Sequence, residues 1–126
     1  MAASDHLHPY QMKLFMQAKD FMNVYAGHTE VGKEGYRLLS ESPNLYSQKL
    51  QESKSGSAPS TMFPKKRGKD SLYESIKKEG VTSPVSLTVH NQDNGPMWEQ
   101  INDGHHRVVA AHDIDPEMYI PIRYDD

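Results

Sequence analysis

Residues 101–111 read Ile101-Asn102-Asp103-Gly104-His105-His106-Arg107-Val108-Val109-Ala110-Ala111, and this stretch decides the fold of the C-terminal part of the chain. It begins as the end of a strand and continues as a helix of small apolar residues, with Gly104 at the tight turn between them. The first amide groups of such a helix point outward and attract anions through hydrogen bonds and the helix dipole. Arg107 adds a permanent positive charge whose shape matches phosphate oxygens. The stretch therefore predicts an anion-binding turn.

The residues on either side predict an α+β fold, a small mixed sheet with helices. Three segments alternate or are rich in strand-forming residues and lie between turn signals, so we expect strands at 84–89, 97–101 and 118–124. Turn-forming residues at 91–96 predict that the first two strands make a hairpin. Asp70 or Ser71 can cap a helix that Gly80 ends. A second helix follows Gly104 and is broken at 113–116.

The first half of the chain is interpreted as a helical N-terminal segment that precedes the sheet. Apolar residues recur at helical spacing in three places, and the predicted helices lie at 7–25, at 30–39 and after Pro43 with Leu45, Tyr46 and Leu50 facing inward. Small polar and turn-forming residues follow, which indicates a linker or mobile loop. We therefore divide the chain into a helical segment at 1–51, a linker at 52–63 and an α/β unit at 64–126.

The composition limits the class of protein. The chain has 126 residues, which fits one domain, and it has no cysteine, which excludes disulfides, thiolate metal sites and cysteine nucleophiles. No apolar run is long enough to span a membrane, and the first residues lack the features of a signal peptide. We therefore expect a cytoplasmic protein with no membrane partner.

A local basic cluster is the candidate for contact with DNA. The net charge of −3 does not favour general binding to nucleic acid, which usually needs a basic surface. The dense group of positive charges consists of Lys65, Lys66, Arg67 and Lys69. It is interpreted either as a patch that contacts phosphates or as a solvated loop.

Several side chains around the central turn offer chemistry near neutral pH. Asp103, His105 and His106 are the candidate catalytic groups, because a carboxylate or an imidazole can take a proton or orient a water. Simpler roles stay open: Asp103 can cap the helix, and one of the histidines can pack inward and bond a backbone carbonyl. His112 and these three residues match no common zinc spacing, so we expect no metal held by protein alone. Mg²⁺ held by phosphates together with Glu74 or Asp103 is compatible with the sequence.

The order of these features resembles the N-terminal domains of ParB proteins, within the ParB/sulfiredoxin superfamily. Residues 71–85 are similar to their segment of helix, glycine, x-x-Pro and strand. Residues 103–111 resemble their Gly-x-x-Arg box, and 120–122 resemble their closing Ile-Pro-Val strand. The resemblance covers residues 71–124, and it implies a ParB/sulfiredoxin-like α+β unit.

The resemblance also implies a nucleotide site. ParB domains bind CTP with this box, so we expect CTP or ATP, with Mg²⁺, to be bound by Gly104, His105, His106 and Arg107, with Ser83 from the preceding loop. Sulfiredoxins carry a cysteine at the position of His105, so their chemistry is excluded here. Related serine kinases have an aspartate like Asp103 that serves as a base. Short stand-alone members, often phage-encoded, are described as nucleases.

Two classes of function follow. The first is a nucleotide-dependent phosphohydrolase, phosphotransferase or nuclease, in which Asp103, His105 or His106 acts on a nucleotide or nucleic acid. The second is a non-enzymatic phage or plasmid protein in the host cytoplasm. It would bind DNA or a host protein, or associate with itself through the N-terminal helices. We expect no operator reading, because the helix-turn-helix domain of partition proteins does not follow the last strand.

Overall fold

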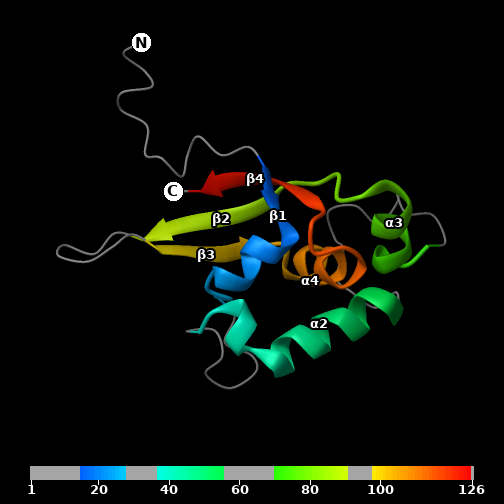
Figure 1. The fold of residues 1–126 in the computed structure, drawn as a ribbon, viewed down its shortest axis with the longest axis horizontal. Coiled ribbons are helices and arrows are strands. Elements are labelled where there is room, and N and C mark those ends of the chain that lie inside the picture. Colours follow the sequence, from blue (N-terminus) through cyan, green and yellow to red (C-terminus); the bar gives the residue numbers. More distant parts are fainter. Residues whose placement is uncertain (1–14, 28–36, 56–69, 91–97, 126) are drawn as a thin grey trace, which may run out of the picture.

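The computed structural model describes residues 15–27, 37–55, 70–90 and 98–125 (Figure 1). Within them lies a mixed four-stranded sheet with the strand order β1-β4-β2-β3. The strands are β1 (Phe15–Gln17), β2 (Val85–His90), β3 (Trp98–Asp103) and β4 (Tyr119–Asp125). β2 and β4 are parallel, whereas β2 and β3, and likewise β1 and β4, are antiparallel. The predicted α+β class with a small mixed sheet is confirmed.

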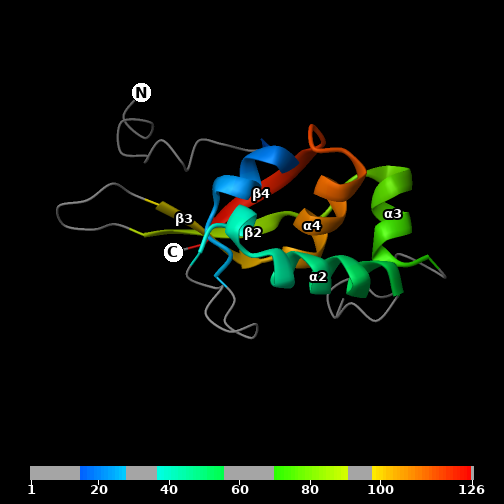
Figure 2. The same cartoon turned by 60° about the horizontal axis from the view of Figure 1, so that its bottom comes forward.

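The helices pack around one central helix, α4. Those in the described residues are η2 (Ala18–Asn23), η4 (Leu39–Glu41), α2 (Pro43–Ser55), α3 (Leu72–Glu79) and α4 (His105–Ile114). α4 contacts α2, α3, η2 and β2, and α2 also contacts α3. Figures 1 and 2 show α2 running beside α4, and α3 at the end of the molecule away from the tips of β2 and β3.

The predicted elements after residue 70 are present. The Ser71 hydroxyl caps α3 by accepting a hydrogen bond from the Glu74 amide at 3.1 Å, and Gly80 ends the helix with φ +77°. The strands lie where they were expected, with ends that differ by a residue or two, and the antiparallel pairing of β2 and β3 confirms that these strands are partners. The turn predicted at 91–96 lies outside the described residues.

The helix predicted over 7–25 is wrong in the part that the structure describes. Residues 15–17 form β1, a 3-10 helix follows, and Tyr25 makes backbone bridges to Leu38 and Gln100. Met16 is buried while Phe15 is exposed, which is the alternation of a strand that pairs with β4. Apolar spacing over so short a stretch fits a helix and a strand equally well. The pairing that makes it a strand is with β4, at the other end of the chain.

The other two predicted helices have different outcomes. The helix predicted at 30–39 is described only over 37–39, where the chain forms the bridge at Leu38 and begins η4. The helix predicted after Pro43 is confirmed as α2, with Leu45 buried. α2 continues to Ser55, so the linker predicted at 52–63 begins too early; its remainder lies outside the described residues.

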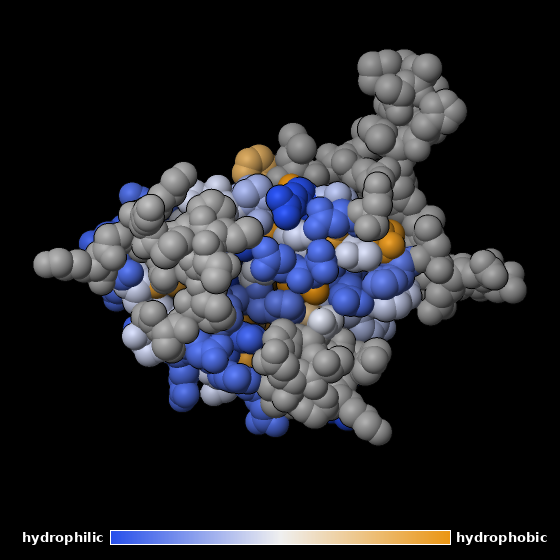
Figure 3. Space-filling model, turned by 180° about the vertical axis from the view of Figure 1, so that it is seen from behind, coloured by the Kyte–Doolittle hydropathy of each residue, from blue (hydrophilic) through white to orange (hydrophobic). Residues whose placement is uncertain are grey.

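Both halves of the chain contribute to one core. The buried apolar side chains include Met16, Phe21, Val24, Leu39 and Leu45 from the first half and Val85, Leu87, Ile101, Val108, Ile120 and Ile122 from the second. Seen from behind the view of Figure 1, the described surface is mainly hydrophilic with scattered apolar side chains (Figure 3). Residues assigned by sequence to a separate N-terminal segment therefore complete the sheet and the core of the α/β unit.

Candidate anion-binding site

Gly104 turns the chain from β3 into α4. Its backbone is left-handed, with φ +113° and ψ 20°, and a Cβ at this position would lie 2.9 Å from Val85 Cγ2. Only glycine meets both conditions without strain. Gly104 is also the N-cap of α4 and has no side chain that could bond the first amide groups of the helix. Asp103 does not cap the helix, so that role, considered from the sequence, is wrong.

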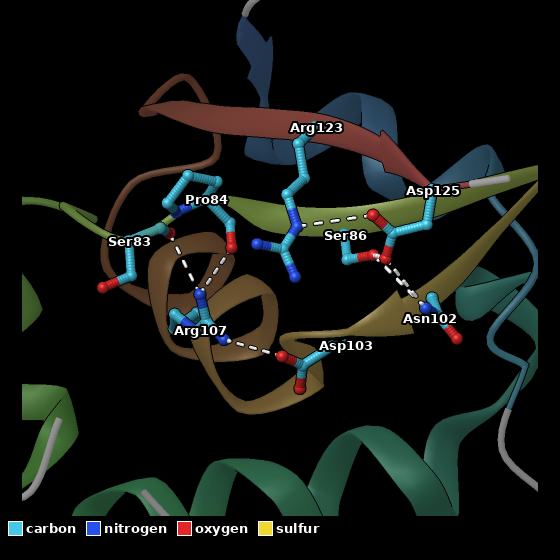
Figure 4. Close-up of polar contacts among 8 residues, drawn as sticks. All are labelled: Ser83, Pro84, Ser86, Asn102, Asp103, Arg107, Arg123 and Asp125. Atoms are coloured by element: carbon cyan, nitrogen blue, oxygen red, sulfur yellow. Dashed lines mark hydrogen bonds and ion pairs between the residues drawn. The ribbon is translucent and has the colours of Figure 1, made fainter. Parts of the chain in front are cut away.

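Arg107 braces the loop that precedes β2. Its Nη1 donates to the carbonyl oxygens of Ser83 at 3.1 Å and Pro84 at 2.7 Å, and its Nη2 lies 3.4 Å from Asp103 Oδ2 (Figure 4). The Arg107 side chain is 12% exposed. Burial is the largest cause that lowers the pKa of Arg107, and the charge of Arg123 lowers it further while Asp103 opposes the change. The guanidinium keeps its charge at neutral pH, but part of its bonding capacity serves the fold.

Ser83 takes part through its backbone. Its carbonyl oxygen accepts from Arg107, whereas its hydroxyl points away from the guanidinium in Figure 4. The hydroxyl is therefore not directed at the arginines. The phosphate contact assigned to Ser83 stays a prediction.

A second arginine lies beside Arg107 and was missed by the sequence analysis. Arg123 projects from β4 with its side chain 57% exposed, and its Nε lies 3.5 Å from Asp125 Oδ1. Figure 4 shows the Arg123 guanidinium between Asp125 and Arg107. The alternation of the last strand could have placed Arg123 on the outer face. Its position beside α4 depends on the parallel pairing of Arg123 with Ser86, which the sequence does not reveal.

Asp125 is held in place by β2 and β3. The Ser86 hydroxyl donates a short hydrogen bond to Asp125 Oδ2, and Asn102 Nδ2 donates to the same oxygen at 3.1 Å and to Ser86 Oγ at 3.3 Å. The bond from Ser86 is the largest cause that lowers the pKa of Asp125. Asp125 therefore stays ionised and anchors the guanidinium of Arg123.

His105 faces the interior. It is 8% exposed, and its Nε2 makes a short hydrogen bond to the carbonyl oxygen of Ala26, so Nε2 carries the proton. The prediction that one histidine packs inward on a backbone carbonyl is confirmed. The catalytic and phosphate-binding roles predicted for His105 do not fit this position, because its imidazole is buried and bonded to a backbone carbonyl.

His106 joins α4 to α2. Its Nε2 lies 2.7 Å from Glu52 Oε1, and the Nζ of the buried Lys49 lies 3.8 Å from the same oxygen. The hydrogen bond from His106 is the largest cause that lowers the pKa of Glu52. Glu52 was not among the predicted site residues, because it falls in the stretch predicted to be a linker. His106 contacts α2 here, and no contact described for it reaches the two arginines.

The remaining candidates lie apart from the turn or outside the described residues. Glu74 is exposed in the first turn of α3, and the structure brings it to neither arginine by a described contact. His112 Nδ1 bonds the Tyr46 hydroxyl at 2.8 Å on the far part of α4. The cluster of Lys65, Lys66, Arg67 and Lys69 lies outside the described residues.

Residues 15–27, 37–55, 70–90 and 98–125 contain neither a cluster of metal ligands nor a membrane-spanning helix. No three histidine, aspartate or glutamate side chains of these residues come together so that they could hold a metal ion. No helix within them is long and apolar enough to cross a bilayer.

Comparison with known proteins adds no relative. No protein-family model, curated protein or solved structure matches this chain significantly. The class that the structure defines is therefore a small α+β protein whose β3–Gly104–α4 turn lies beside two neighbouring arginines.

Proposed function

We propose that this chain binds the phosphates of a nucleotide at a site formed by Arg123, Arg107 and the first turn of α4. The observation that carries the proposal is the pair of neighbouring guanidinium groups, with Arg123 largely exposed. The resemblance to ParB domains supports the same place, because their Gly-x-x-Arg box corresponds to residues 104–107. CTP and ATP are therefore the ligands that we expect.

The electrostatics of the site favour a bound anion locally. Two like charges that lie close together repel each other, and an anion between them removes that repulsion. The first amide groups of α4 add the positive end of the helix dipole. Asp103 and Asp125 balance the two arginines, so the site exerts little attraction at long range. We therefore expect a site that recognises phosphate by geometry and binds it with modest affinity.

The positions of the predicted catalytic groups support binding over hydrolysis. His105 is bonded to Ala26 in the interior, and His106 is bonded to Glu52 on α2. Neither imidazole is thereby directed at the arginines as a general base. Asp103 is half-exposed beside Arg107 and is the group that could orient a water. A hydrolytic step at this site would therefore fall to Asp103.

Isothermal titration with CTP, ATP, ADP and pyrophosphate in the presence of Mg²⁺ tests the proposal. Arg123→Ala removes a charge-assisted hydrogen bond to phosphate and should lower affinity about ten-fold or more. Because Arg123 is exposed, its removal should leave the free energy of unfolding within about 0.5 kcal/mol of wild type. Arg37→Ala is the matched control, since Arg37 is exposed and on a different segment. Equal affinity of Arg123→Ala and wild type, or no binding by wild type, contradicts the proposal.

A further inference from the structure

Two large apolar side chains of the described residues are exposed on one face of the sheet. Phe15 is 58% exposed and Tyr119 is 65% exposed. β1 pairs with β4 so that Phe15 lies opposite Pro121 and Gln17 lies opposite Tyr119. Side chains at such positions share a face, and the diagonal pair Phe15 and Tyr119 is separated by about 7–8 Å. The two rings therefore form one exposed aromatic patch.

The same face carries the exposed arginine of the phosphate site. Arg123 follows Tyr119 by four residues along β4, so alternation places both on the same face, about 13 Å apart. The buried residues between them, Ile120 and Ile122, face the core on the opposite side. The patch and the phosphate site are thus parts of one continuous surface.

A second aromatic group on the sheet, formed by His90, Trp98 and Tyr25, is packed together, whereas the patch of Phe15 and Tyr119 is exposed. The His90 ring stacks on Trp98 with centroids 4.0 Å apart, and the Tyr25 ring meets Trp98 edge-on at 4.8 Å. These three rings are half-buried against one another. Phe15 and Tyr119 instead present most of their surface to solvent, so both rings are accessible to a ligand.

We infer that this face binds single-stranded nucleic acid, with bases stacked on Phe15 and Tyr119 and a phosphate on Arg123. The inference rests on the proposed function, because Arg123 supplies the phosphate contact in both. Exposed aromatic rings on a sheet stack on unpaired bases of any sequence, since every base has a π face. Bases in a duplex are stacked on each other and are not available to the rings.

The distance between Arg123 and Tyr119 along β4 separates binding of a nucleic-acid strand from binding of a mononucleotide. A mononucleotide bound at Arg123 and Arg107 has no second base to place on rings that begin about 13 Å away. A strand of several nucleotides reaches both the arginine and the patch. The two ligands should therefore respond differently to substitutions in the patch.

Fluorescence anisotropy with a labelled deoxythymidine strand of about ten nucleotides tests the inference. Phe15→Ala and Tyr119→Ala should each weaken binding on the order of ten-fold, and the double variant should weaken it further. Tyr119→Phe keeps the ring and should bind like wild type. Phe15→Leu keeps an apolar side chain without a ring and should bind like the alanine variant. The same variants should bind pyrophosphate and CTP as wild type does, whereas Arg123→Ala should lose affinity for all of these ligands.

The outcomes separate the inference from the proposed function. If the double variant binds the strand as tightly as wild type, the inference is overturned, and the phosphate site stands as long as Arg123→Ala weakens pyrophosphate binding. If light scattering shows a wild-type dimer that the double variant does not form, the patch is a self-association surface and the inference fails. If wild type binds neither the strand nor pyrophosphate, both fail.

Discussion

Replacing Gly104 with alanine tests whether backbone geometry fixes the turn between β3 and α4. A left-handed backbone costs an alanine about 1–2 kcal/mol. The new Cβ would also lie 2.9 Å from Val85 Cγ2 and 3.2 Å from Cγ1, and such crowding of a buried side chain costs about 1–3 kcal/mol. We expect Gly104→Ala to lose about 2–5 kcal/mol of unfolding free energy, a large share of the about 5–15 kcal/mol of a typical domain.

Urea denaturation followed by circular dichroism and tryptophan fluorescence measures this loss. The chain has a single tryptophan, Trp98, which lies at the start of the strand that leads into Gly104, so its emission reports the sheet. Thermal unfolding should show a midpoint lower by roughly 10 °C.

Two further variants separate the two costs. Gly80 has φ +77° and ψ −173°, a backbone region almost confined to glycine, and nothing lies within 4 Å of a Cβ there, so Gly80→Ala should lose only a backbone cost of about 1–3 kcal/mol. Val85→Ala in the Gly104→Ala background removes the crowding, so the two substitutions together should cost less than the sum of their separate effects. A Gly104→Ala variant within about 0.5 kcal/mol of wild type would refute the reasoning.

Two other predictions concern the histidines of α4. His105→Ala removes the side chain that bonds the Ala26 carbonyl in the interior, so it should lower the free energy of unfolding by about 2–4 kcal/mol, measured by urea denaturation. A variant as stable as wild type would contradict the structural role of His105. The folded-state pKa of Glu52 is lowered by His106, so the stabilisation is present above the ordinary pKa of Glu52 and is lost as pH falls through the folded-state pKa. Glu52→Gln should therefore lose less stability than wild type between about pH 6 and about pH 3, by about 1 kcal/mol or less, and identical pH profiles would contradict this.

The parts of the fold that the sequence predicted correctly are those with local causes. Ser71 caps α3 in its first turn, and Gly80 and Gly104 mark positions where the backbone has a positive φ. Such signals lie within a few residues of the structure that they determine. Strands β2 and β4 show their alternation in the same local way. These elements could therefore be placed without knowledge of their neighbours.

The parts of the fold that could not be predicted from the sequence depend on partners far away in the chain. β1 exists as a strand because it pairs with β4, and nothing in the spacing around Met16 shows that partner. Arg123 joins the site because β4 lies parallel to β2. Glu52 reaches His106 because α2 packs alongside α4. In each case, the deciding contact is set by tertiary packing rather than by local preference.

The directions of the side chains in the first turn of α4 explain why only some of the site residues could be predicted. Successive helical residues point about 100° apart, so consecutive side chains in one turn meet different surroundings. His105 bonds Ala26 in the interior, His106 bonds Glu52 on α2, and Arg107 braces the loop before β2. The turn thus ties three segments of the fold together through its side chains. Under the proposed function, the turn would contribute its backbone amides and part of the Arg107 guanidinium to an anion. The exposed positive charge comes from Arg123 on β4. The motif therefore connects three segments of the fold, and under the proposed function it would bind an anion only together with its neighbour Arg123.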